Sequence, residues 1–167
     1  SPVSSDSRSV QQIAHLEEQL GFEKIYEITG QPPSTLFTLP KIMWWKDYEQ
    51  SLFQQTWKFL CYGDFVTMQL GLPPVIDHTM AARTMAFDIR SLDWSEEMLA
   101  TAGIDKDRLA THLPSGTIIG EIPHIVAHNL GFTDNVQVVT GGHDQPCAAL
   151  GAGVFQPGEA LYSIGTT

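Results

Sequence analysis

Hydrophobic residues recur at helical spacing over most of the first 130 positions. In Ser9–Leu20 the apolar residues fall mostly three or four positions apart, and Gly21 follows as a helix stop. Ser95–Ala102 carries a fuller signal, because Ser95 is a good N-cap, two glutamates occupy the first turn and Gly103 ends the segment. The same signals predict helices at Phe22–Ile28, Thr38–Tyr48 with Thr38 as N-cap, Ser51–Phe59, Asp64–Leu70 with Asp64 as cap, Asp105–Ala110 as one turn, Pro123–Leu130, and either a helix or a loop at Thr79–Thr84.

The most informative segment is Gly141–Gly151, where a strand pattern changes to a helix pattern. The β-branched run Val136–Thr140 predicts a short buried strand, and the small apolar run Pro146–Ala152 predicts a helix with proline in its first turn. Asp144 therefore lies at a strand-to-helix junction, beside a crevice and near the positive end of a helix dipole. A carboxylate there can orient and deprotonate a substrate hydroxyl. The alternative is that Asp144 only caps the helix, which is the commoner role of aspartate at a helix start.

Helices between isolated strands indicate an α/β or α+β fold. A last strand is expected at Leu161–Ile164. With 167 residues, the chain is long enough for one domain with a sizeable core or for a portion of a larger protein. Because it begins without methionine and stops just after an expected strand, we expect the second alternative.

Composition narrows the classes of function. The proportions of 43% hydrophobic and 17% charged residues are typical of a soluble globular protein. The net charge of −10, with only nine lysines and arginines that do not cluster, argues against binding to nucleic acid or an anionic membrane. No N-terminal signal is visible, and no apolar run approaches the roughly 20 residues that cross a bilayer. Cys61 and Cys147 lie far apart, which argues against a zinc site or a disulfide framework and favours reduced thiols in a cytoplasmic protein.

Several short motifs occur in order along the chain. They are Asp6–Arg8, Thr38–Trp44, Asp77–Phe87, Leu92–Ser95, Gly120–Ile122, Gly142–Gln145 and Ser163–Thr167. In this order they resemble motifs of the FGGY family of carbohydrate kinases over nearly the whole chain, as the second half of the family's N-terminal domain. Each motif alone is weakly specific. The ordered set is a strong signal, and it favours the catalytic role of Asp144 over the capping role.

The resemblance implies an α/β fold of the actin-like ATPase and ribonuclease H-like class, present in part, with a mixed sheet and flanking helices. Residues 1–157 would belong to the N-terminal, substrate-side domain, and residues 158–167 would begin the C-terminal, ATP-side domain. The implied activity transfers the γ-phosphoryl group of ATP to a hydroxyl of a sugar or polyol, with a substrate of the xylulose type, the glycerol type or another ketose or polyol type. ATP and Mg²⁺ are the implied cofactors. The chain by itself is expected to be inactive, because nearly all of the ATP-side domain lies outside it.

The resemblance also implies the site residues. Asp144 would be the catalytic base, and alignment matters more than basicity because phosphoryl transfer passes through a loose transition state. The other implied contacts are to the substrate, from Gln145, His143, Asp77 and Thr79 as well as Asp144, and to the ATP phosphates, from Gly165, Thr166 and Thr167.

Simpler roles are open for several polar residues. Asp77 and Thr79 are about equally compatible with helix capping and with substrate contact. For His143 a surface or packing role is favoured, and Lys41 is expected to pack its stem on Trp44. The pair of histidines at positions 124 and 128 lies one helical turn apart without a third ligand nearby, so no metal site is predicted.

Two departures from the family pattern bear on the substrate. Ser4 replaces a common tryptophan and Leu36 replaces a tyrosine of the glycerol kinases, which argues against glycerol itself. A different class of protein also stays open, namely a non-catalytic sugar-binding or regulatory relative of the same superfold. The sequence does not decide the oligomeric state, and a homodimer is one alternative.

Overall fold

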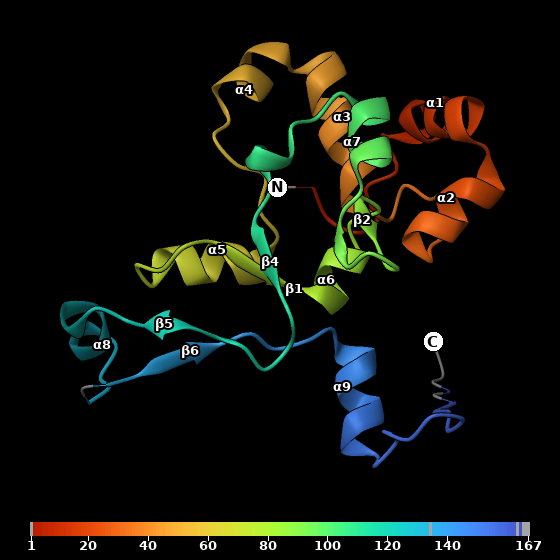
Figure 1. Ribbon diagram of the computed structural model, residues 1–167. Helices are drawn as coiled ribbons and strands as arrows, with labels where there is room; N and C mark the ends of the chain where they lie inside the picture. Colours follow the sequence, from red (N-terminus) through yellow and green to blue (C-terminus); the bar gives the residue numbers. More distant parts are fainter. Residues whose placement is uncertain (1, 134, 163, 165–167) are drawn as a thin grey trace.

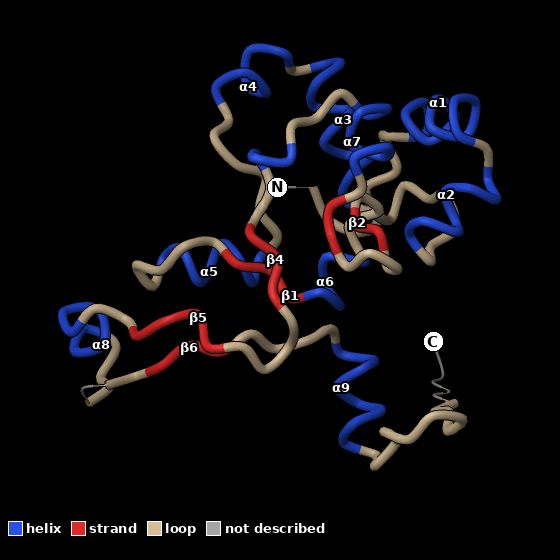
Figure 2. The backbone as a smooth tube through the Cα atoms, viewed as in Figure 1, coloured by secondary structure: helices blue, strands red, loops and turns tan. Residues whose placement is uncertain are grey.

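The computed structural model describes residues 2–133, 135–162 and 164, and its strands form three separate pairs (Figure 1, Figure 2). The pairs are β1 (Val75–Asp77) with β4 (Thr111–Leu113), parallel, and two antiparallel pairs, β2 (Phe87–Asp88) with β3 (Asp93–Trp94) and β5 (Ile118–Glu121) with β6 (Gln137–Val139). The helices are α1 (Val10–Leu20), α2 (Phe22–Thr29), α3 (Thr38–Tyr48), α4 (Gln50–Gln55), α5 (Tyr62–Gln69), α6 (His78–Ala82), α7 (Glu96–Ala102), α8 (His124–Asn129) and α9 (Asp144–Gly151), with a 3₁₀ turn at Lys106–Arg108. This part of the chain is a mixed α/β structure, as expected.

The hydrophobic core lies where α1, α3 and α7 pack together beside the β2–β3 pair (Figure 1). Trp94 joins this pair to the rest of the core. Its indole Nε1 donates to the carbonyl oxygen of Ala110 at 3.1 Å, and its ring meets the ring of Phe87 edge-on with centroids 5.6 Å apart. The largest fully buried side chains are those of Phe87, Leu16, Ile25, Leu39, Met85 and Met98.

The capping residues predicted from the sequence are correct for α7 but not for α3. Ser95 Oγ accepts from the Met98 N–H at 3.2 Å, and Gly103 ends α7 with φ at +66°, as its sequence predicts. At α3 the predicted cap is wrong by one residue. Phe37 is the N-cap and Thr38 is the first helical residue, because the extended backbone of Phe37 directs its ring into the core, where it is 4% exposed.

Helix α4 ends earlier than predicted. We expected helix to Phe59, but the helix ends at Gln55, and Arg108 accounts for the end. Its guanidinium donates to the carbonyl oxygen of Phe53 in the last turn of α4 and, at 2.6 Å, to that of Thr56, the C-cap residue. A residue about 50 positions away in sequence therefore satisfies this helix terminus.

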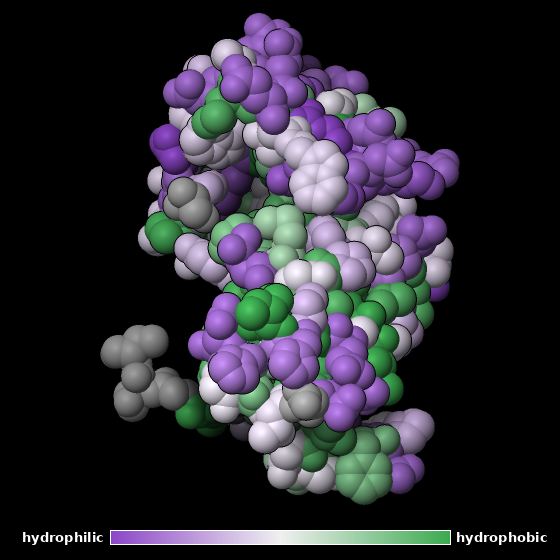
Figure 3. Space-filling model, turned by 90° about the vertical axis from the view of Figure 1, so that its left-hand side faces the viewer, coloured by the Kyte–Doolittle hydropathy of each residue, from purple (hydrophilic) through white to green (hydrophobic). Residues whose placement is uncertain are grey.

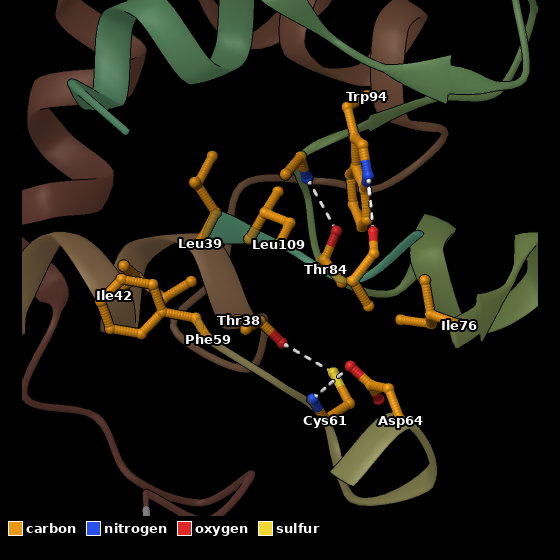
Figure 4. Close-up of a pocket in the computed structure, with 12 residues that line it drawn as sticks. Thr38, Leu39, Ile42, Phe59, Cys61, Asp64, Ile76, Thr84, Trp94 and Leu109 are labelled. Atoms are coloured by element: carbon orange, nitrogen blue, oxygen red, sulfur yellow. Dashed lines mark hydrogen bonds between the residues drawn. The ribbon is translucent and has the colours of Figure 1, made fainter. Parts of the chain in front are cut away.

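Helix α5 begins with a polar pair, the partly buried Cys61 and the buried Asp64 (Figure 4). Its N-cap is Cys61 and not Asp64 as predicted, since Asp64 occupies the third helical position and accepts from the Cys61 N–H at 2.9 Å. Asp64 is 2% exposed, and its Oδ1 has no hydrogen-bond partner among the described residues. Burial raises the pKa of Asp64 to about 6 and that of the Cys61 thiol to about 11. The surrounding wall is mostly apolar and includes Leu39, Ile42, Phe59, Ile76, Trp94 and Leu109.

The β5–β6 hairpin, α8 and α9 lie below the core in Figure 1. The hairpin and the α8 region expose Ile118, Ile125 and Phe132, and Figure 3, which faces this side of the molecule, shows hydrophobic residues among hydrophilic ones in its lower half. The strand predicted at Leu161–Ile164 is wrong for the residues described there. Leu161, Tyr162 and Ile164 have no regular structure, because none of the three strand pairs includes this segment. None of the helices in the described residues is long and apolar enough to span a membrane.

Candidate active site

The candidate site begins where the two parallel strands end. Asp77 is the last residue of β1 and pairs in register with Leu113, the last residue of β4. The Asp77 side chain is buried and caps α6, since its Oδ1 accepts from the Thr79 N–H at 2.9 Å and from the Met80 N–H at 3.2 Å. The same oxygen accepts from the hydroxyl of Thr79 and, at 3.5 Å, from that of Ser115 in the loop after β4. These contacts favour the capping alternative for Asp77, and a substrate contact stays a prediction.

Asp144 lies at the predicted junction between β6 and α9, but the prediction that this strand is buried is wrong, since Gln137 and Val139 of β6 are exposed. Asp144 is the first residue of α9 and the N-cap is His143, so Asp144 is not the capping residue of its own helix. Its side chain is 80% exposed, and its Oδ1 lies 3.1 Å from Nδ1 of His143, whose side chain is 26% exposed. The carboxylate is thus held through one neighbour and open to solvent, as a group that receives a substrate hydroxyl must be.

Thr79 joins the two halves of this site. Its Oγ1 accepts from the backbone N–H of His143 at 2.7 Å, across 64 residues of sequence. Gly142 lies against the same hydroxyl, because a Cβ built on Gly142 would be 3.4 Å from Thr79 Oγ1 and 3.1 Å from Cys147 Sγ. The structure therefore brings together four of the five predicted substrate-contacting residues, namely Asp77, Thr79, His143 and Asp144.

Gln145 follows Asp144 in the first turn of α9 and is exposed. The predicted phosphate contacts of Gly165, Thr166 and Thr167 lie outside the described residues. Lys41 has a structural role, while the packing of its stem on Trp44 stays a prediction. It is buried on α3 and its Nζ donates to the carbonyl oxygen of Leu36 at 2.9 Å.

Sequence reasoning missed two residues of the site, Thr140 and Ser115. Thr140 directly follows β6 and is 7% exposed. Its hydroxyl donates to the carbonyl oxygen of Pro114 at 2.7 Å and accepts from the Thr117 N–H at 2.8 Å. A polar residue between a β-branched run and a glycine pair was the available signal, but only the fold shows its partner.

Two further histidines lie beside α6. Nε2 of His78 is 3.3 Å from Nδ1 of His112, and Nε2 of His112 is 3.0 Å from Oδ1 of Asp93. Burial and the neighbouring His112 lower the pKa of His78. Both imidazoles pack on the ring of Phe87, with centroids 5.4 and 5.3 Å away, so this group is joined to the core. Within the residues that the structure describes, no three His, Cys, Asp or Glu side chains are grouped to hold a metal.

Known proteins share both this sequence and this fold. A xylulose kinase of Staphylococcus xylosus is 30% identical over 163 residues, which cover 98% of this chain and 34% of that protein. A xylulose kinase of Bacillus subtilis is 32% identical over 164 residues, covering 98% of this chain and 32% of that protein. The chain therefore spans about a third of the length of these curated relatives.

The solved structure of a xylulose kinase from Rhodospirillum rubrum superimposes with a TM-score of 0.83 at 24% identity, covering 93% of this chain and 32% of that chain. This likeness confirms the predicted fold class, the actin-like ATPase fold. The N-terminal domain of the FGGY family of carbohydrate kinases matches residues 2–151. The chain belongs to the FGGY family of carbohydrate kinases.

Proposed function

We propose that the protein containing this chain is an ATP-dependent kinase that phosphorylates a hydroxyl of a sugar or polyol. A ketose of the xylulose type is the first candidate, because the relatives described above are xylulose kinases. The observation that carries the proposal is the exposed carboxylate of Asp144 at the start of α9, joined through His143 and Thr79 to the end of β1.

In the proposed reaction the substrate oxygen attacks the γ-phosphorus of ATP, the bond from that phosphorus to the β,γ-bridging oxygen breaks, and ADP leaves. Asp144 orients the attacking hydroxyl, accepts its proton and later releases the proton to water. The contact of His143 with one carboxylate oxygen restrains the side chain, while the other oxygen can accept the hydroxyl. Because the transition state is loose, this alignment supplies more of the rate than basicity does. Gln145 would hydrogen-bond a second hydroxyl of the substrate.

The nucleotide and its metal are proposed to bind across from Asp144. Mg²⁺ usually takes phosphate oxygens together with one or two carboxylates, so it would enter with ATP and neutralise phosphate charge. Gly165, Thr166 and Thr167 are the proposed phosphate contacts. Residues 1–157 would form part of the substrate-side domain, and residues 158–167 would begin the ATP-side domain. A cytoplasmic location and a homodimer stay predictions.

The test uses the full-length protein with ATP, Mg²⁺ and a panel of D-xylulose, D-gluconate and glycerol, with ADP release measured by a coupled assay. We expect turnover with at least one acceptor. Asp144→Ala should lower kcat by about 10²–10⁴-fold, the usual contribution of a general base, while calorimetry still detects sugar binding. Asp107→Ala, which removes an exposed aspartate from the 3₁₀ turn, is the control and should leave kcat unchanged.

Two results would contradict the proposal. Unchanged turnover in Asp144→Ala would remove Asp144 from the mechanism. Sugar binding without ADP release from any acceptor would instead support the non-catalytic relative.

A further inference from the structure

Two threonine hydroxyls hold the loop that leads to Asp144, one at each end. Between Thr140 at one end of the loop and His143 at the other lie only Gly141 and Gly142, which have no side chains to restrain the backbone. The position of this loop therefore depends on what is bound at its two ends.

The first hydroxyl is that of Thr79, at the Asp144 end of the loop. Its single proton is donated to Asp77 Oδ1, and its oxygen accepts from the His143 N–H at 2.7 Å. A hydroxyl that has already donated its proton cannot also donate it to a substrate. The contacts thus suit Thr79 to positioning His143 and, through the next peptide bond, Asp144.

The second hydroxyl is that of Thr140, at the strand end of the loop. It donates to the carbonyl oxygen of Pro114 at 2.7 Å and accepts from the Thr117 N–H at 2.8 Å. The backbone adds two bonds at the same place, from the Gly116 N–H to the Thr140 carbonyl oxygen and from the Thr140 N–H to the Thr117 carbonyl oxygen, both 2.9 Å. Since Thr140 is 7% exposed, little water is available to replace these partners.

Both anchors lead back to the parallel strands. Asp77 ends β1, and Pro114 directly follows the end of β4, whose last residue pairs in register with Asp77. Ser115 links the two anchors, because its hydroxyl donates to Asp77 Oδ1 at 3.5 Å.

We propose that Thr79 and Thr140 are positioning residues that hold the Gly141–Gly142 loop on the ends of β1 and β4 and so aim Asp144 at the substrate hydroxyl. The inference rests on the proposed function for its catalytic consequence. The anchoring of the loop stands independently of the reaction, so it can be measured without turnover.

The activity test compares Thr→Val and Thr→Ser at both positions in the full-length protein with ATP, Mg²⁺ and the acceptor found in the panel. Valine keeps the shape of threonine without the hydroxyl, so Thr79→Val and Thr140→Val should lower kcat by about 10- to 100-fold, as a misplacement near 1 Å does. KM for ATP should stay within about twofold, because neither hydroxyl would touch the nucleotide. Thr79→Ser and Thr140→Ser keep the hydroxyl and should recover most of kcat.

Thr29→Val is the matched control. The Thr29 hydroxyl is also buried, and it likewise donates to a carbonyl oxygen, that of Ile25, at 2.8 Å and accepts from a backbone N–H, that of Gln31, at 3.1 Å. It lies at the end of α2 and outside the loop. We expect Thr29→Val to leave kcat unchanged even if it lowers stability.

Hydrogen exchange of peptides covering residues 141–147 supplies a readout that does not need activity. Losing one net hydrogen bond of about 1 kcal/mol should speed exchange at the His143 amide by about fivefold in Thr79→Val. Faster exchange in a protein that phosphorylates none of the acceptors would refute the proposed function and leave the anchoring supported. An active protein in which both valine variants keep the wild-type kcat would overturn the positioning role, and so would equal losses in Thr29→Val or no recovery with serine.

Discussion

The buried carboxyl group of Asp64 should make the stability of the protein fall as pH rises. Asp64 is 2% exposed, its Oδ1 has no partner among the described residues, and burial raises its pKa from the ordinary 3.8 to about 6. The nearby carboxylate of Asp77 acts in the same direction. Between about pH 4 and pH 6, Asp64 therefore keeps its proton in the folded state and has lost it in the unfolded state.

The magnitude follows from the two pKa values. One pKa unit corresponds to about 1.4 kcal/mol, so ionising Asp64 in the folded state costs about 3 kcal/mol. The contribution of Asp64 is most favourable below about pH 4, where both states are protonated. It falls progressively until about pH 6 and stays low above that pH, where both states are ionised.

The perturbation is Asp64→Asn, which keeps an oxygen to accept from the Cys61 N–H but cannot ionise. Urea denaturation of the full-length protein would be followed by tryptophan fluorescence between pH 4 and pH 7.5. The free energy of unfolding of the variant minus that of the wild type should rise by about 2.5 kcal/mol over this range, because a small part of the roughly 3 kcal/mol is already lost at pH 4. Any fixed effect of the new amide group moves the whole curve up or down and does not alter this rise.

Asp105→Asn is the matched control, because Asp105 is an exposed aspartate whose side chain caps the 3₁₀ turn by accepting from the Asp107 N–H at 2.9 Å. This control shows whether the loss of an exposed capping carboxylate changes the pH dependence of the free energy of unfolding as Asp64→Asn does. A difference for Asp64→Asn that is flat, or that shrinks as pH rises, would refute the reasoning.

Two further predictions concern stability, both measured by urea denaturation of the full-length protein. Arg108→Leu should lower the free energy of unfolding by about 1–3 kcal/mol, because it removes the donor to the carbonyl oxygen of Thr56 and one of the two donors to that of Phe53. An unchanged midpoint would show that water replaces the guanidinium. Leu92→Gly should raise the free energy of unfolding by about 1 kcal/mol, because Leu92 is half exposed and adopts φ of +56°, a conformation that glycine enters without strain. A lower free energy of unfolding would mean that the contacts of the leucine side chain outweigh the relief of backbone strain.

Local chemistry accounts for the parts of the fold that the sequence predicts well. Ser95 and Gly103 bound α7 as expected, because a cap and a stop act within one turn of the helix. At α5 the sequence predicts Asp64 as the cap, but the extended backbone of Cys61 places the cap three residues earlier. The early end of α4 depends on Arg108, which no local signal near α4 reveals.

The candidate site also has one part that the sequence predicts and another that it does not. The junction at Asp144 is readable because a strand pattern, two glycines and a helix pattern follow one another in sequence. The partners of that loop are not readable, since Thr79 lies 64 residues from His143 and Thr140 lies 23 residues from Thr117. The first contact requires α6 to lie beside the loop before α9, and the second continues the pairing of β5 with β6 at Ile118 and Val139.

The few hydrogen bonds that hold the loop before Asp144 determine the order in which parts of the protein unfold on warming. Each of these bonds contributes only about 1 kcal/mol, whereas the whole fold is separated from its unfolded state by about 5–15 kcal/mol. We therefore expect the loop to detach before the core unfolds, and the proposed kinase activity should be lost at temperatures where the tryptophan spectrum is still native. For the proposed kinase, the temperature at which activity is lost would then depend on the few hydrogen bonds that hold this loop, which can be altered without repacking the core.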